Sequence, residues 1–140
     1  MFLELKFGTD HLDWHEVCYL FERAPLGTRE PDKLRRAAEN SYVVCSAFDG
    51  SALIGFGRAL SDGEYQSAIY DMVVSPECQG RGVGTAIMNG LMERLPQGKA
   101  LIYAVPGKEG FYRKLGFATL LTGMGRFSDP EMAREKGYIA

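Results

Sequence analysis

The residues best suited to chemistry surround a glycine-rich segment at positions 79–85, which reads Gln-Gly-Arg-Gly-Val-Gly-Thr. The segment follows an apolar run that ends at Val74 and precedes apolar residues at helical spacing. Amides at a helix N-terminus lack intrahelical acceptors, the helix dipole adds positive potential, and glycines let phosphate oxygens approach the backbone. We therefore expect a diphosphate site here, the alternative being a tight strand-to-helix turn that binds no ligand.

Two common nucleotide-binding motifs do not fit this segment. A P-loop requires a lysine after its last glycine, but Gly84 is followed by Thr85. The dinucleotide fingerprint requires a third glycine or alanine three residues after its second glycine, and Thr85 occupies that place when the count starts at Gly80. The sequence thus disfavours both nucleoside triphosphates and NAD as ligands.

The helices and strands around this segment can be predicted from the spacing of apolar residues and from the prolines and glycines that interrupt them. Asp10 is the expected N-cap of a first helix that contains Trp14 and Phe21, and Pro31 opens a second, shorter helix. Further helices are expected over residues 83–95 and 109–115 and after residue 129. The expected strands span residues 2–7, 42–48, 52–60, 65–74, 99–105, 117–120 and 124–127.

These elements predict a layered α/β (α+β) domain, because an antiparallel meander runs into a strand-helix-strand unit and helices then pack on a mixed sheet. The chain has 140 residues, of which 46% are hydrophobic and 24% charged, and this matches a single domain over residues 1–140. The formal charge of -2 leaves no basic surplus for binding a nucleic acid.

No segment indicates a membrane span or an exported protein. No stretch reaches the roughly 20 apolar residues of a membrane helix, and charges interrupt the apolar N-terminus. The three cysteines are odd in number and lack CxxC spacing, which indicates reduced thiols rather than disulfides or a zinc site. We expect a cytoplasmic protein with neither a membrane nor a nucleic acid as partner.

The segment from Gln79 to Gly84 resembles the pyrophosphate loop of the GNAT superfamily of N-acetyltransferases, Gln/Arg-x-x-Gly-x-Gly/Ala. The run Met72-Val73-Val74-Ser75-Pro76 resembles the family's strand before the loop, and Phe111-Tyr112-Arg113-Lys114-Leu115-Gly116-Phe117 resembles its tyrosine segment. The resemblance is clear over residues 52–127. It implies the GNAT fold, a mixed, mostly antiparallel central sheet of about six or seven strands flanked by about four helices.

The resemblance also implies a ligand and its contacts. Acetyl-coenzyme A would be the acyl donor, and no metal would be needed. The implied cofactor-binding residues are Met72, Val73, Val74, Gln79, Gly80, Arg81, Gly82, Val83, Gly84, Thr85, Phe111 and Tyr112. One departure is the run of residues 105–108, Val-Pro-Gly-Lys, where many members carry an asparagine that contacts the cofactor.

In the implied reaction, a primary amine of a small molecule attacks the thioester directly in a ternary complex. An amide of Val73 or Val74 would stabilise the oxyanion, and Tyr112 would protonate the leaving thiolate, unless it only packs on Leu115. Two alternatives stay open: a non-catalytic module that senses acetyl-coenzyme A, and transfer of another acyl chain or transfer to a hydroxyl. Whether the protein forms a homodimer is also open.

The attacking amine must lose a proton, which requires a base or a chain of waters. Asp71 is the only charge between Ile69 and Val74, and burying an unpaired carboxylate is costly, so we expect it to face a wet cleft or a cationic partner. It is the first candidate for the base, and a structural ion pair is the alternative. Fallback acids are Asp62, Glu64 and Glu109, and the family suggests that Arg29 and Glu30 line the acceptor site.

Overall fold

The protein is described by a computed structural model that covers residues 1–140, and these divide into two compact parts, Met1–Ile102 and Tyr103–Ala140. The prediction that all 140 residues form one domain stays a prediction. No helix has the length and apolar composition to cross a membrane.

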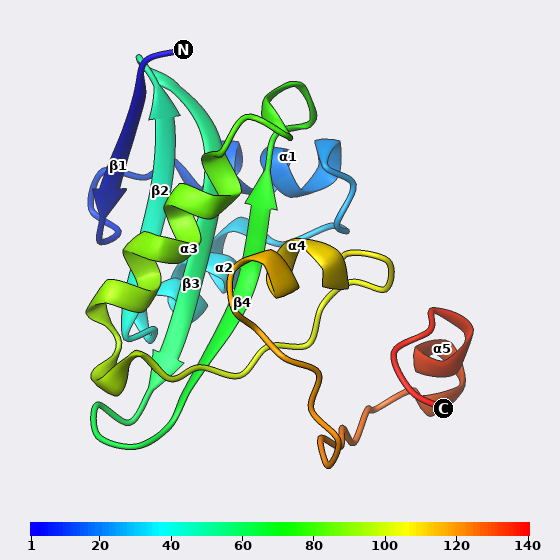
Figure 1. The fold of residues 1–140 in the computed structure, drawn as a ribbon. Helices are drawn as coiled ribbons and strands as arrows, with labels where there is room; N and C mark the ends of the chain where they lie inside the picture. Colours follow the sequence, from blue (N-terminus) through cyan, green and yellow to red (C-terminus); the bar gives the residue numbers. More distant parts are fainter. The chain divides into compact units, whose positions relative to one another are not determined.

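The N-terminal part is built on one antiparallel sheet. Its strands are β1 (Leu3–Phe7), β2 (Val43–Asp49), β3 (Ala52–Ser61) and β4 (Ser67–Val74), and they lie in the order β1-β2-β3-β4 (Figure 1). The predicted meander of three successive strands is therefore confirmed.

The expectation of six or seven strands is wrong, because the sheet has four. Residues 99–105 form no strand, and Leu101 alone makes a parallel bridge to Ala68. Residues 117–127 contain no strand either. Gly123 and Gly125 interrupt this apolar run, and glycine is depleted in strands because it loses more backbone freedom than other residues.

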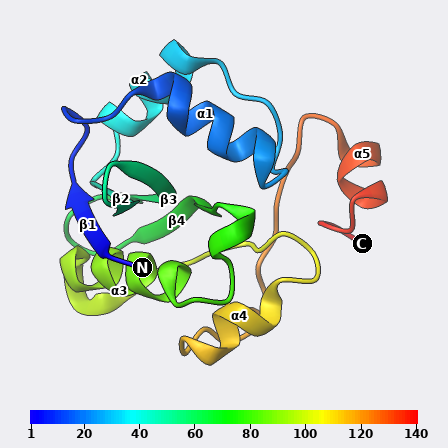
Figure 2. The same cartoon turned by 90° about the horizontal axis from the view of Figure 1, so that it is seen from above.

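Helices cover both faces of the sheet (Figure 2). On one face lie α1 (Trp14–Arg23) and α2 (Pro31–Glu39), and on the other lies α3 (Val83–Arg94). The N-cap of α1 is Asp13, not the expected Asp10, because the Asp13 side chain accepts a hydrogen bond from the amide of His15. Two short 3-10 helices, η1 (Pro76–Cys78) and η2 (Pro96–Gly98), flank α3 in the sequence.

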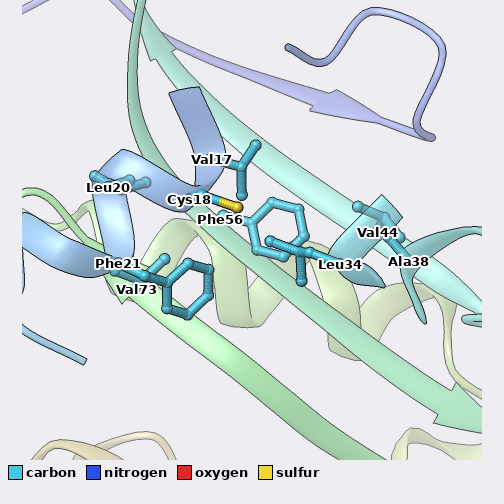
Figure 3. Close-up of a cluster of buried hydrophobic side chains, with 9 residues drawn as sticks. All are labelled: Val17, Cys18, Leu20, Phe21, Leu34, Ala38, Val44, Phe56 and Val73. Carbon is cyan, nitrogen blue, oxygen red and sulfur yellow. The ribbon is translucent and has the colours of Figure 1, made fainter. Parts of the chain in front are cut away.

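A hydrophobic core joins α1 and α2 to the sheet (Figure 3). Phe56 of β3 lies at its centre, and its ring centroid is 6.2 Å from those of both Trp14 and Phe21. The amphipathic spacing that predicted α1 thus corresponds to a buried face. The nine buried residues are Val17, Cys18, Leu20, Phe21, Leu34, Ala38, Val44, Phe56 and Val73.

On the opposite face, two glycines of β3 let α3 approach the sheet closely. A Cβ atom placed at Gly55 would lie 2.7 Å from Ile87, and one at Gly57 would lie 2.5 Å from the Met72 sulfur and 3.0 Å from Ile87. Such distances are shorter than side-chain contacts allow. α3, whose N-terminus carries the glycine-rich segment, can therefore lie this close to β3 only because Gly55 and Gly57 have no side chain.

The C-terminal part contains α4 (Glu109–Lys114) and α5 (Pro130–Glu135), so the chain has five α-helices instead of about four. Both were expected from the sequence, α5 only as a helical turn or two. The rings of Tyr103, Phe127 and Tyr138 cluster with centroids 5.8 to 6.2 Å apart. Ala133 is the only buried residue of this part.

Candidate functional site

The glycine-rich loop, residues 79–85, leads from η1 into α3. Gly80 and Gly82 have left-handed backbones, with φ of 76° and 86°, and Gly82 is the N-cap of α3 without any side-chain cap. A Cβ atom at either glycine would meet nothing within 4 Å. The loop thus combines uncapped helix amides with open space above the backbone, which is the arrangement that an anion needs.

The other side chains of the loop divide into exposed and buried ones. Gln79 and Arg81 are exposed, and the side-chain Nε2 of Gln79 donates a hydrogen bond of 3.1 Å to the carbonyl of Val74. Val83 is only 1% exposed, so its side chain belongs to the core and it can offer a ligand only its backbone. Gly84 and Thr85 lie in the first turn of α3 and are partly exposed.

The residues that precede the loop, 75–78, are bonded to the rest of the N-terminal part. The Ser75 amide donates to the carbonyl of Ile54, and Arg23 of α1 forms an ion pair of 2.9 Å with Glu77 of η1. Cys78 is buried, like the other two cysteines, and all three are free thiols. The loop therefore starts from a well-anchored segment.

Upstream of the loop, β4 contains a bulge. The register shifts between Phe56 and Arg58 of β3, so Gly57 lies opposite two residues of β4, Asp71 and Met72. Asp71 has a φ of 57°, in the left-handed region that residues with a side chain rarely adopt. This bulge lies within the strand that the sequence assigned to the pantetheine arm, Met72, Val73 and Val74.

The Asp71 carboxylate is held by two arginines. Its Oδ1 accepts a hydrogen bond of 2.7 Å from Nη2 of Arg29, and its Oδ2 accepts one of 2.7 Å from Nε of Arg58. Burial raises the pKa of the Asp71 carboxyl, but the hydrogen bonds and charges of Arg29 and Arg58 outweigh this effect and the pKa lies below its ordinary value. Only 13% of the side chain is exposed.

Of the two roles that the sequence left open for Asp71, the ion pair is therefore present in the structure. Each oxygen already accepts a charged hydrogen bond, and the lowered pKa makes the group a weaker base. This geometry favours the ion pair over direct proton abstraction.

Sequence reasoning missed Arg58, which joins the site through this ion pair. Arg58 could have been found by the pattern that indicated Asp71, a single charge in an apolar strand, because it is the only charged residue within residues 52–60. Arg29 was assigned to the acceptor side by family resemblance, and the structure places it on the Asp71 carboxylate. Glu30 caps α2, where it accepts hydrogen bonds from the amides of Asp32 and Lys33.

The fallback acids serve local structure. Asp62 accepts hydrogen bonds from three amides, those of residues 64, 65 and 66, and these bonds lower its pKa. Glu109 accepts a hydrogen bond from the Gly107 amide, in the segment that departs from the family pattern. Glu64 is exposed in the turn that Asp62 holds. No group of three or more His, Cys, Asp or Glu residues could hold a metal ion.

Tyr112 lies on α4 in the C-terminal part, between two other aromatic residues. Its ring centroid is 5.0 Å from that of Phe111 and 5.9 Å from that of Phe117. Burial raises the pKa of the Tyr112 hydroxyl above its ordinary value, so the group keeps its proton at neutral pH. The ring packs on Phe111 and Phe117, whereas the expected packing on Leu115 stays a prediction, and the hydroxyl can still donate a hydrogen bond.

Comparisons with known proteins agree with these features. The acetyltransferase (GNAT) family profile matches residues 9–117. Serotonin N-acetyltransferase 2, chloroplastic, from Oryza sativa subsp. japonica is 41% identical over 115 residues, which cover 76% of this chain and 57% of that protein. The uncharacterized N-acetyltransferase ycf52 of Porphyra purpurea is 31% identical over 117 residues, 79% of this chain and 67% of that one.

Solved structures share the fold. A GNAT family acetyltransferase from Streptococcus pneumoniae superposes with a TM-score of 0.77 at 25% sequence identity, and the match covers 90% of this chain and 98% of that one. This chain spans little more than half the length of the rice relative. The profile match, the identity to these relatives and the shared fold show together that this chain belongs to the GNAT acetyltransferase family.

Proposed function

We propose that this protein transfers the acetyl group of acetyl-coenzyme A to the primary amine of a small molecule. The observation that carries the proposal is the glycine-rich loop, because its left-handed glycines and uncapped amides leave open backbone at the N-terminus of α3. The rice relative is named for serotonin, an arylalkylamine, and this supports a small-molecule amine as acceptor.

The residues present fit the coenzyme. The amides of the loop would hold its diphosphate, since no side chain of the chain caps them and no Cβ fills the space above Gly80 and Gly82. The backbone of Met72, Val73 and Val74 would hold the pantetheine arm. When bound, acetyl-coenzyme A supplies an activated thioester. An amide of Val73 or Val74 would stabilise the negative charge that develops on the thioester oxygen.

The proton of the acceptor is best removed through water. An alkylamine has a pKa near 10, and the pKa of Asp71 lies below the ordinary 3.8. Direct transfer to Asp71 would therefore be uphill by at least about 8 kcal/mol. We propose a water chain as the route and keep direct abstraction by Asp71 as the alternative, which the pH profile of an Asp71→Asn variant would reveal.

Tyr112 is proposed to assist the leaving thiolate. A thiol has a pKa near 8.5, and the hydroxyl of Tyr112 has a pKa raised above 10 by burial, so full proton transfer is unfavourable. The hydroxyl would instead donate a hydrogen bond that strengthens as charge gathers on sulfur. The cytoplasmic location and the homodimer stay predictions.

The decisive experiment measures release of free coenzyme A thiol with a panel of acceptors. Serotonin and tryptamine represent arylalkylamines, and polyamines, amino acids and aminoglycosides represent other amines. Release with an amine, and mass gain of one acetyl group on that amine, would support the proposal. If calorimetry shows coenzyme A binding but no acceptor causes release of the free thiol, a sensor would be supported. Release with a hydroxyl analogue of the same acceptor would indicate O-acetylation.

A further inference from the structure

Helix α2 is tied at both ends to a single carboxylate, that of Asp71 on β4. Arg29 comes two residues before the helix, and Arg58 reaches the turn that follows it. The Arg58 Nη1 donates a hydrogen bond of 3.3 Å to the Ser41 hydroxyl, and this hydroxyl donates to the carbonyl of Ala37 in α2 at 2.9 Å. The connections before and after α2 therefore meet at the β4 bulge.

The Arg29 side chain is held on three sides. Its Nη1 donates to the carbonyl of Leu26 at 3.3 Å within the same loop, and its Nη2 donates to Asp71. Its guanidinium carbon lies 4.2 Å from the centroid of the buried Phe21 ring of α1. A guanidinium that stacks on an aromatic face, while one terminal nitrogen binds a carboxylate and the other a backbone carbonyl, is a rigid connection. The loop of residues 24–30 is thus attached to both α1 and β4.

The point of attachment on β4 has an unfavourable backbone. A residue with a side chain in the left-handed region persists where its surroundings hold it, and such residues gather at functional sites. Asp71 has this backbone, and its two carboxylate oxygens accept hydrogen bonds from Arg29 and Arg58. The ion pairs therefore hold the bulge as well as the loop.

We propose that Asp71 is a positioning residue that sets α2 and the loop of residues 24–30 against the β4 bulge, and thereby shapes the acceptor side of the active site. This inference rests on the proposed acetyl transfer. The glycine-rich loop begins α3, on one face of the sheet, whereas the ion-paired cluster joins β4 to the connections of α2 on the other face (Figure 2). Beyond the bulge, Val73 and Val74 of the proposed pantetheine strand stay paired with β3 without the Asp71 charge. Loss of this charge should therefore affect the acceptor more than the coenzyme.

Three variants separate the connections. Arg29→Ala should release only the loop before α2, Arg58→Ala only the turn after it, and Asp71→Asn both. Asparagine tolerates the left-handed backbone, so the last variant removes the charge while keeping the bulge accessible. The matched control is Arg35→Ala, which removes an arginine of α2 whose ion pairs with Asp32 and Glu39 lie on the helix itself.

Amide hydrogen exchange is the first measurement, because it needs no acceptor. We expect Asp71→Asn to speed exchange at least about tenfold both in residues 24–30 and in residues 41–42, and Arg35→Ala to leave both unchanged. Exchange that rises at one end only in Asp71→Asn, or at neither end, would overturn the proposal. This outcome is independent of whether acetyl transfer occurs.

Kinetics and calorimetry supply the second measurement. With the best amine of the panel, Asp71→Asn should raise the acceptor KM at least about tenfold while coenzyme A affinity changes less than about threefold. Arg29→Lys, which keeps the charge but not the fork, should recover part of the loss that Arg29→Ala causes. A loss of kcat with unchanged acceptor KM would contradict positioning. Absence of turnover by the wild type would instead refute the proposed function and leave the exchange result to decide.

Discussion

The β4 bulge and the glycine-rich loop both contain left-handed backbone, yet their surroundings are opposite. At Asp71 the side chain is 13% exposed and bonded to two arginines, whereas a Cβ at Gly80 or Gly82 would touch nothing. Where a side chain with bonded partners holds a left-handed backbone, that backbone can fix the position of the neighbouring elements. Where such a backbone borders open space, it can bind a ligand. We therefore assign a positioning role to the β4 bulge and a ligand-binding role to the glycine-rich loop.

The largest effect is expected from Gly82→Val. A side chain there would occupy the open space and strain a backbone with φ of 86°. Coenzyme A affinity should fall at least about a thousandfold, because charge-assisted hydrogen bonds to phosphate contribute about 2 kcal/mol each and two or more would be lost. Isothermal calorimetry on the folded variant measures this loss.

Gly50→Val is the control, since Gly50 also has a positive φ, 61°, and open space around it, but lies between β2 and β3. Both variants should lose about 1–2 kcal/mol of unfolding free energy. Equal coenzyme A affinity in the two would mean that the glycine-rich loop is only a turn.

A smaller effect, on rate alone, is expected from Tyr112→Phe. The ring contacts with Phe111 and Phe117 stay and the hydroxyl is lost, so coenzyme A affinity should be kept. Turnover should fall about a hundredfold, the lower end of general-acid effects, because a thiolate is already a tolerable leaving group. Single-turnover rates measure the step, and a wild-type rate would show that Tyr112 only packs.

The pH dependence of stability tests the bulge. The folded-state pKa of Asp71 is lowered, so its ion pairs stabilise the protein above the unfolded pKa near 4 and this contribution is lost as the pH falls through the folded value. Asp71→Asn should therefore be less stable than the wild type by about 3 kcal/mol at pH 7, as expected when one partner of a largely buried pair is removed.

Urea titrations at several pH values measure this difference. The gap between wild type and Asp71→Asn should begin to shrink below about pH 4, where the carboxyl of the unfolded chain takes up a proton. It should close as the pH falls further, through the lowered pKa of Asp71 in the folded protein. A gap that stays constant down to pH 2 would show that the carboxylate charge does not stabilise the bulge.

The smallest effect is expected from Arg35→Ala. This arginine pairs with Glu39 at 2.9 Å on the surface of α2, with 39% and 46% of the two side chains exposed. Exposed helical pairs contribute about 0.5 kcal/mol or less, and salt screens them. A loss comparable to that of Asp71→Asn in the same urea titrations would remove the distinction between buried and exposed pairs on which the comparison depends.

What could be predicted from the sequence had local signals. The glycine-rich segment and α3 follow from glycine spacing and a single apolar stripe, and the meander follows from alternation between turns. The ion-paired cluster depends on three residues distant in the sequence, 29, 58 and 71, and on a bulge that no local pattern encodes. The prediction of strands within residues 117–127 was wrong. The apolar residues around Gly123 and Gly125 resemble a strand pattern, but this segment pairs with no other strand.

In a deep mutational scan that reports both cellular abundance and activity, the glycines of this chain should fall into two classes. Substitutions at Gly55 and Gly57 would force α3 away from β3, so the variants should be depleted from the folded pool. Substitutions at Gly80 and Gly82 meet no neighbouring atom, so those variants should accumulate with only mild loss and yet be inactive. A scan scored on activity alone would merge the classes, whereas the ratio of the two scores would mark the ligand-facing backbone.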